Sequence, residues 1–220
     1  MSHESTTLRG VRCARFAASS TTMLRTLLLL TAITAGTHGP VSAQCVIDSE
    51  LLGAASSTSF AVIDGNRAVS SDGSSVELFD RTTGSWLLEQ SIDLAGATLL
   101  SIGLEGSDLM LGLSGEVRLY LHDGISWTLD TVMDGATSGS ADPGWGSALG
   151  HSGDLLAVGS PDTDETYFFT RVFDGAGVPA WIPGGVVLGT PGDGFGTEIS
   201  LSGSYVSISA PTAGQVLTFE

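Results

Sequence analysis

The sequence has no lysine and only two cysteines in 220 residues. Its eight cationic side chains are all arginine and face 24 acidic residues, which gives a formal net charge of −16 at pH 7. A surface of this sign repels phosphate backbones and anionic lipid headgroups, so nucleic acid and membrane surfaces are poor partners. We explain the acidic composition by solubility in preference to the alternative, which is cation binding.

Long apolar runs are absent apart from one near the N-terminus, at residues 27–35, which is too short to cross a bilayer as a helix. Arg25 precedes this run, and Val41-Ser42-Ala43 after it has the small-residue pattern of a cleavage site. We therefore expect residues 1–43 to be a signal peptide that is cut before Gln44. A start at Met23 would give a compact signal peptide, with residues 1–22 as an over-long gene start.

Export has consequences for what remains. Removing the first 43 of 220 residues leaves 177, which is enough for one domain with a sizeable core, residues 44–220. We expect this domain to be secreted, periplasmic or extracellular, without membrane insertion. Gln44 stands where a lipoprotein signal needs a small residue, so no lipid anchor is expected. Cys45 remains alone, which excludes an internal disulfide.

Internal repeats are the strongest feature of the sequence. Trp145–Pro161 and Phe195–Pro211 match at an offset of 50 residues. Each begins with an aromatic-Gly pair, reaches a Ser-Gly turn seven residues later, and continues into a β-rich run that ends in a small residue and proline. Weaker copies of the turn and the run after it lie at Gly106–Gly112 and at Asp64–Ser70.

The second half of each unit repeats as well. Three units have a valine three residues before an aromatic residue, at Val76–Phe79, Val117–Tyr120 and Val216–Phe219. In the remaining unit we assign Thr170–Phe173 to this position. Three of the four tryptophans then occupy one repeat position: Trp86, Trp127 and Trp181. Stacking on a sugar ring or a partner is one role for such side chains, but packing between repeats is commoner, and we expect them, with Phe79, Tyr120 and Phe219, in the core.

Each unit reads as four short strands separated by turns rich in Gly, Ser, Asp and Asn. In the first unit the strands are expected near 58–63, 67–70, 75–80 and 85–92. No stretch of the mature sequence has a convincing helical stripe, and 30 glycines suit tight hairpins. The sequence therefore predicts an all-β fold, a small β-propeller of about four four-stranded blades.

The two best units resemble the FG-GAP repeat of integrin α-subunit propellers and many bacterial secreted proteins. The resemblance rests on Trp145-Gly146 with Gly159-Ser160-Pro161, and on Phe195-Gly196 with Ser209-Ala210-Pro211. It is clear over 145–220 and degenerate over 58–134. It implies a β-propeller that engages an extracellular protein or glycan.

The last unit ends at Glu220, after its third strand. A candidate for the fourth strand lies at the other end of the domain, because Cys45–Asp48 stands 41 residues before Trp86–Glu89, which stands 41 residues before Trp127–Asp130. This spacing predicts that the mature N-terminus supplies the outer strand of the last blade and closes the ring. The competing interpretation is a fragment of a larger propeller.

Calcium is the first ligand to test, because many FG-GAP blades carry an Asp-rich loop between their first two strands. Here that loop has shrunk to short turns at 105–108, 151–154 and 202–204, and one carboxylate in a tight turn cannot supply six to eight oxygens. Asp162 and Asp164 could share a cation but are more typical of a solvated hairpin tip. We therefore predict no cofactor and no metal site, with Asp162 and Asp164 as weak metal candidates.

Catalytic patterns are incomplete. Gly150-His151-Ser152-Gly153 resembles the G-x-S-x-G nucleophile elbow, but its second glycine comes one position too early. The segment also lies in a predicted hairpin. His122 and His151 lie in different repeats without an evident partner. The sequence favours a secreted, non-enzymatic binding or structural module. The alternative is a secreted hydrolase or lyase that uses acidic residues at the channel of the propeller.

Overall fold

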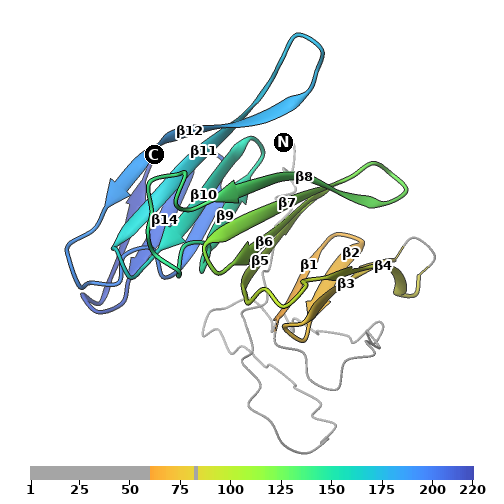
Figure 1. The fold of residues 1–220 in the computed structure, drawn as a ribbon, viewed down its shortest axis with the longest axis horizontal. Helices are drawn as coiled ribbons and strands as arrows, with labels where there is room; N and C mark the ends of the chain where they lie inside the picture. The colour runs from red at the N-terminus through yellow and green to blue at the C-terminus, as the bar shows by residue number, and fades with distance from the viewer. Residues whose placement is uncertain (1–59, 82–83) are drawn as a thin grey trace, which may run out of the picture. The chain divides into compact units, whose positions relative to one another are not determined.

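The computed structural model describes residues 60–81 and 84–220, in which the strands form four antiparallel sheets in chain order (Figure 1). The first sheet contains β1 (Phe60–Asp64), β2 (Arg67–Ser71), β3 (Ser75–Asp80) and β4 (Leu87–Asp93). The second contains β5 (Leu99–Glu105), β6 (Asp108–Leu113), β7 (Glu116–His122) and β8 (Trp127–Asp134). The third contains β9 (Leu149–Ser152), β10 (Leu155–Ser160), β11 (Glu165–Phe173) and β12 (Pro179–Leu188), and the fourth β13 (Ile199–Ser202), β14 (Tyr205–Ala210) and β15 (Gln215–Phe219).

These bounds confirm the all-β class, the four-unit repeat and the four strands expected in the first unit. Every sheet begins with a two-strand hairpin whose turn contains one glycine at a positive φ of 58–60°: Gly65, Gly106, Gly153 or Gly203. Glycine adopts this conformation without a steric penalty, so the turn residues determine where each unit begins.

The pairing register defines equivalent positions and corrects one sequence assignment. Val76, Val117 and Val216 pair with Ser71, Gly112 and Ser209, as the repeat predicts. In the third sheet the partner of Gly159 is Thr166, so the equivalent segment is Thr166–Phe169 and the assignment of Thr170–Phe173 was wrong. The reason is that the third-sheet hairpin is longer, with nine residues in β11 and ten in β12. This places Phe169 in the core and Phe173 near the hairpin tip, 58% exposed.

The fourth sheet has three strands in the described part of the chain, whereas the other three sheets have four. The fourth strand predicted for it, residues 45–52, lies outside the described residues. Ring closure by that segment therefore stays a prediction.

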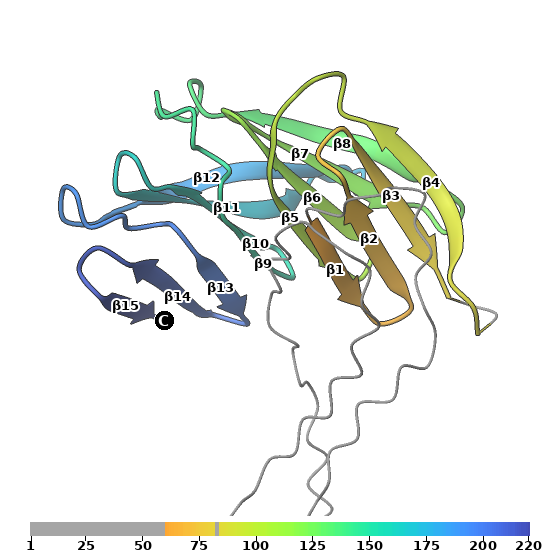
Figure 2. The same cartoon turned by 90° about the horizontal axis from the view of Figure 1, so that it is seen from below.

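Neighbouring sheets pack face to face through a repeated arrangement (Figure 2). The first strands of consecutive sheets lie together, β1 with β5, β5 with β9, and β9 with β13. We call the face of a sheet toward the next sheet in the chain its forward face, and the opposite one its rear face. Each forward face and the rear face that follows it enclose one apolar cluster.

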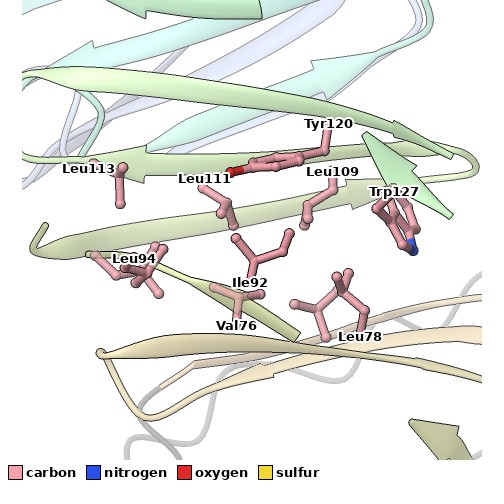
Figure 3. Close-up of a cluster of buried hydrophobic side chains, with 11 residues drawn as sticks. Val76, Leu78, Ile92, Leu94, Leu109, Leu111, Leu113, Tyr120 and Trp127 are labelled. Carbon is pink, nitrogen blue, oxygen red and sulfur yellow. The ribbon is translucent and has the colours of Figure 1, made fainter. Parts of the chain in front are cut away.

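The cluster between the first two sheets is mainly aliphatic (Figure 3). Val76, Leu78 and Ile92 from β3 and β4 face Leu109 and Leu111 from β6. Tyr120 and Trp127 from the second sheet border the same cluster. Burying each large aliphatic side chain stabilises the fold by roughly 1.5–3 kcal/mol.

The aromatic-Gly pairs join the later sheets. Trp145 and Phe195 come from the linkers before the third and fourth sheets and are buried in the second and third clusters. The glycine of the first pair, Gly146, lies so close to Gly112 on β6 that a Cβ at Gly112 would collide with the Gly146 carbonyl oxygen. Gly196 and Gly159 repeat this contact one sheet later. The motif therefore combines an aromatic wedge with a close backbone contact.

Candidate functional site

Ionisable side chains gather between the sheets near the turns that join first to second strands and third to fourth strands. The cluster between the first and second sheets contains Arg67, Glu89, His122 and Trp127. The Glu89 carboxylate accepts hydrogen bonds from His122 Nε2 at 2.7 Å and Trp127 Nε1 at 3.0 Å. Arg67 lies over the Trp127 ring at 5.4 Å and also donates to the Gly106 carbonyl at 2.7 Å. These contacts link the two sheets.

The protonation of His122 follows from its neighbours. Its Nδ1 accepts hydrogen bonds from an Arg67 guanidinium nitrogen at 2.7 Å and from the Gly124 backbone N–H at 3.1 Å. Two donors at Nδ1 require its lone pair, so we assign the ring proton to Nε2, which donates to Glu89. Both ring nitrogens are therefore engaged inside the protein, which suits a linking role better than that of a general base.

A second cluster lies between the second and third sheets. Arg171 binds the carboxylates of Asp108 at 2.9 Å and Asp154 at 3.0 Å and lies over the Trp181 ring at 5.3 Å. Burial lowers the pKa of Arg171, but the hydrogen bonds to Asp108 and Asp154 outweigh it and hold the pKa above its usual value. The His151 side chain is only 3% exposed, and its Nδ1 lies 2.7 Å from a Glu105 carboxylate oxygen.

The serine that resembled a nucleophile has a different role. Ser152 ends β9, and its Oγ accepts a hydrogen bond from the Gly203 backbone N–H at 3.0 Å. The contact belongs to a series, because Asp64 accepts from Gly106 N–H at 2.6 Å and Glu105 accepts from Gly153 N–H at 3.2 Å. Each hairpin turn is thus bonded to the equivalent glycine of the next sheet. We call this series the turn relay.

The two weak metal candidates differ in environment. Asp162 is exposed, whereas Asp164 is buried and has a φ of 57°. The Asp164 carboxylate accepts hydrogen bonds from the backbone N–H groups of Gly192, Gly194 and Phe195 at 2.6, 2.7 and 3.1 Å. The Gly192 contact is the largest cause that lowers the pKa of Asp164, while burial opposes it. Asp164 therefore holds the linker before the fourth sheet in place.

A buried polar network lies at the same end of the third sheet. Asp142 accepts from Ser160 Oγ at 2.8 Å, and Ser160 Oγ lies 3.0 Å from Ser140 Oγ. Tyr167 donates to Glu165 at 2.6 Å, and burial together with that carboxylate raises the pKa of Tyr167 to about 12. Within residues 60–81 and 84–220, no group of three or more His, Cys, Asp or Glu side chains is arranged to hold a metal ion.

The three repeated tryptophans occupy the position predicted for them, each beside a cationic or imidazole side chain. Trp86 lies beneath Arg81, Trp127 beside His122 and Trp181 beneath Arg171. Trp127 is buried with Phe79 and Tyr120, whereas Trp86, Trp181 and Phe219 are half-buried. Sequence reasoning identified the aromatic partner of each pair. It missed the arginine or histidine beside each one, which lies in or just after the third strand of its sheet.

Apolar side chains are exposed on the β11–β12 hairpin, which extends beyond the neighbouring strands (Figure 1). They are Val172, Phe173, Val178 and Ile182, and we call them the hairpin patch. Exposed apolar side chains of this kind often mark an interaction site. Val172 and Ile182 lie on one face of the hairpin and Phe173 on the other, because Ile182 pairs with Thr170 and side chains alternate along a strand. Among the described residues, no helix has the length and apolar character needed to span a membrane.

No family model matches the chain, and no curated protein does. Two computationally designed proteins of known structure are similar to it. Ika4 is 16% identical with a TM-score of 0.50, and the match covers 78% of this chain and 96% of Ika4. Ika8 is 14% identical with a TM-score of 0.56, and the match covers 78% of this chain and 48% of Ika8. The chain thus spans about half the length of Ika8, and at these identities the likeness concerns the fold alone.

Proposed function

We propose that the chain is a secreted, non-enzymatic binding or structural module with the architecture of a small four-bladed β-propeller, as the resemblance to FG-GAP repeats implies. Four consecutive antiparallel sheets support this architecture, and the fold is shared with the designed protein Ika4. Residues 45–52 complete the last blade in this proposal. The export that it requires is checked by N-terminal sequencing, which should begin at Gln44.

The hairpin patch carries the functional part of the proposal. Its four apolar side chains are exposed near the tip of one hairpin, in a chain whose formal net charge is −16. Burying them against a partner would gain roughly 25 cal/mol per Å² of apolar surface removed from water. Branched aliphatic and aromatic contacts favour an extracellular protein over a glycan as that partner.

Binding is tested with the envelope fraction of the producing cells as bait for the purified chain. The double variant Phe173→Ser/Ile182→Ser should lose most of the retained material. A matched control is Ile125→Ser/Leu129→Ser, which removes exposed apolar side chains from the neighbouring β7–β8 hairpin and should bind like the wild type. Equal binding by both double variants would argue against the hairpin patch, and no binding by the wild type would contradict the binding function.

The architecture is tested by deleting residues 45–52. The predicted closing strand would supply ladder hydrogen bonds and apolar burial to the last sheet. The net stability of a domain is only about 5–15 kcal/mol, so this contribution matters. We expect the deletion to unfold or aggregate the domain, as followed by circular dichroism and light scattering. A deleted chain with an unchanged melting temperature and unchanged hydrodynamic size would refute the closing strand.

A further inference from the structure

On the forward face of the fourth sheet, side chains are exposed at repeat positions that are buried by the next sheet in the first and second sheets. Val216 is 69% exposed, whereas Val76 and Val117 at the same repeat position are fully buried by the next sheet. Tyr205 is 54% exposed, and its equivalents Arg67 and Asp108 contact the sheet that follows. A following sheet would complete these contacts.

The rear face of the first sheet shows the complementary exposure. Phe60 and Val62 point forward into the first apolar cluster, so strand alternation directs Ile63 to the rear. Ile63 is 64% exposed, whereas Leu201 at the same position of the fourth sheet is buried against the sheet before it. A preceding sheet would cover Ile63.

The turn relay adds a hydrogen-bond acceptor to the exposed face of the fourth sheet and a donor to the exposed face of the first sheet. Asp64, Glu105 and Ser152 each accept a hydrogen bond from a glycine N–H of the next sheet. By position, Ser202 of the fourth sheet is the next acceptor, and Gly65 of the first sheet is the equivalent donor. The last sheet and the first sheet therefore present the two halves of the contact that joins all the other sheets.

We infer that the forward face of the fourth sheet docks on the rear face of the first sheet of a second copy of this chain. The contact continues the interface that the chain uses three times internally, with Val216 and Tyr205 on one side and Ile63 on the other. The contact is heterologous, so it closes into a ring only when the rotation between copies closes. Because the match covers 48% of Ika8, we take two copies as the closed assembly, with two identical contacts. The inference rests on the proposed repeat of four sheets, but it takes the competing interpretation of a larger propeller, in which the ring closes between two copies in place of closure within one chain by residues 45–52. It does not rest on the proposed ligand.

A second copy is favoured because the two faces do not meet within one chain. Among the described strands, the packing that joins β1 to β5, β5 to β9 and β9 to β13 has no counterpart of comparable extent between β13 and β1. The same four sheets also superpose on about half of Ika8, so in that fold they occupy half of a longer chain. A second copy would supply the other half.

The oligomeric state tests the inference. The purified chain should sediment as a dimer at micromolar concentration. Val216→Glu and Ile63→Glu, which put a charge into opposite faces of one seam, should each give a monomer. Leu188→Glu is the matched control, because Leu188 is also 69% exposed but lies on β12, away from both end faces, and this variant should stay dimeric.

A milder change guards against misfolding of the charged variants. Ser202→Ala removes one relay hydrogen bond from each seam and should raise the dimer dissociation constant about tenfold with an unchanged circular dichroism spectrum. A monomeric wild type would overturn the inference, as would dimers that survive both Val216→Glu and Ile63→Glu. Loss of the dimer in Leu188→Glu as well would also contradict it. Capture of envelope material reports on the ligand separately, so the two proposals can fail independently.

Discussion

Three interfaces, which we call seams, join consecutive sheets. The seam between the first two sheets is packed with different residues from the two later seams. In the first seam the linker contributes the fully buried Leu94, and polar bridges tie the sheets together: Gln90 bonds both backbone groups of Trp127 at 2.8 and 2.9 Å. In the later seams, Trp145 or Phe195 fills the space and a glycine docks on the sheet before it. The comparison indicates that the aromatic-Gly motif is one way to pack two sheets and that aliphatic packing around Leu94 takes its place in the first seam.

The largest loss of stability is expected when the side chains that fill the seams, Trp145 and Leu94, are truncated. Trp145→Ala should lower the free energy of unfolding by about 3–5 kcal/mol, because it removes a buried aromatic side chain and leaves a cavity. Leu94→Ala should cost about 2–5 kcal/mol, since Leu94 fills the first seam. Urea unfolding measures both. A loss well below 1 kcal/mol for Leu94→Ala would show that the first seam depends on its polar bridges instead.

The close backbone contact is probed by adding one methyl group. Gly112→Ala and Gly159→Ala place a Cβ against the carbonyl of Gly146 or Gly196 and should each cost about 1–3 kcal/mol through overpacking. Gly175→Ala is the control, because no atom lies within 4 Å of a Cβ built there. If the three variants unfold at the same urea concentration, the later seams do not depend on the glycine contact.

Asp164 tests how the linker before the fourth sheet is held. Asp164→Asn keeps a side chain that tolerates positive φ but removes the charge that accepts three N–H groups, so it should cost about 1–2 kcal/mol at neutral pH. Asp164→Gly removes any backbone strain as well, and Gly115 and Gly214 occupy the equivalent position in other sheets. A more stable glycine variant would show that backbone strain at Asp164 outweighs its hydrogen bonds.

The same residue predicts a pH dependence. The folded-state pKa of Asp164 is lowered, chiefly by the Gly192 N–H, so its contribution is present above the unfolded pKa of about 3.9 and is lost as pH falls through the lower folded value. Urea unfolding from pH 6 downward should therefore bring the wild type and Asp164→Asn closer together below about pH 4. A constant difference across this range would contradict the linkage.

The smallest effect is expected for calcium. The hairpin turns that could have held the ion instead make the turn relay, and Asp164 is already bonded to three backbone N–H groups. Millimolar calcium and a chelator should therefore give nearly equal melting temperatures. A rise of many degrees with calcium would locate a site, and Asp162→Asn would be the first variant to test it.

Local patterns made the repeat predictable, whereas contacts between repeats did not follow from them. Turn glycines and alternating apolar residues act within one hairpin, so the strand positions and the three equivalent tryptophans could be derived from spacing. The extended pairing of β11 with β12 shifted the apparent repeat, which is why Phe173 was chosen in place of Phe169. Arg67, Glu89 and His122 come together only when two sheets pack, so the spacing of residues within one repeat does not predict their contact.

The long β11–β12 hairpin has a consequence for solubility. β12 is an outer strand of ten residues without a charged side chain, and such an edge can pair with a strand of another molecule and begin aggregation. Pro179 and Pro183 interrupt this edge, since neither offers a backbone N–H. A register shift between Phe168 and Phe169 distorts the ladder next to Pro183. Proline and backbone irregularity thus provide at this edge the protection against fibril growth that lysine side chains provide in many other β proteins.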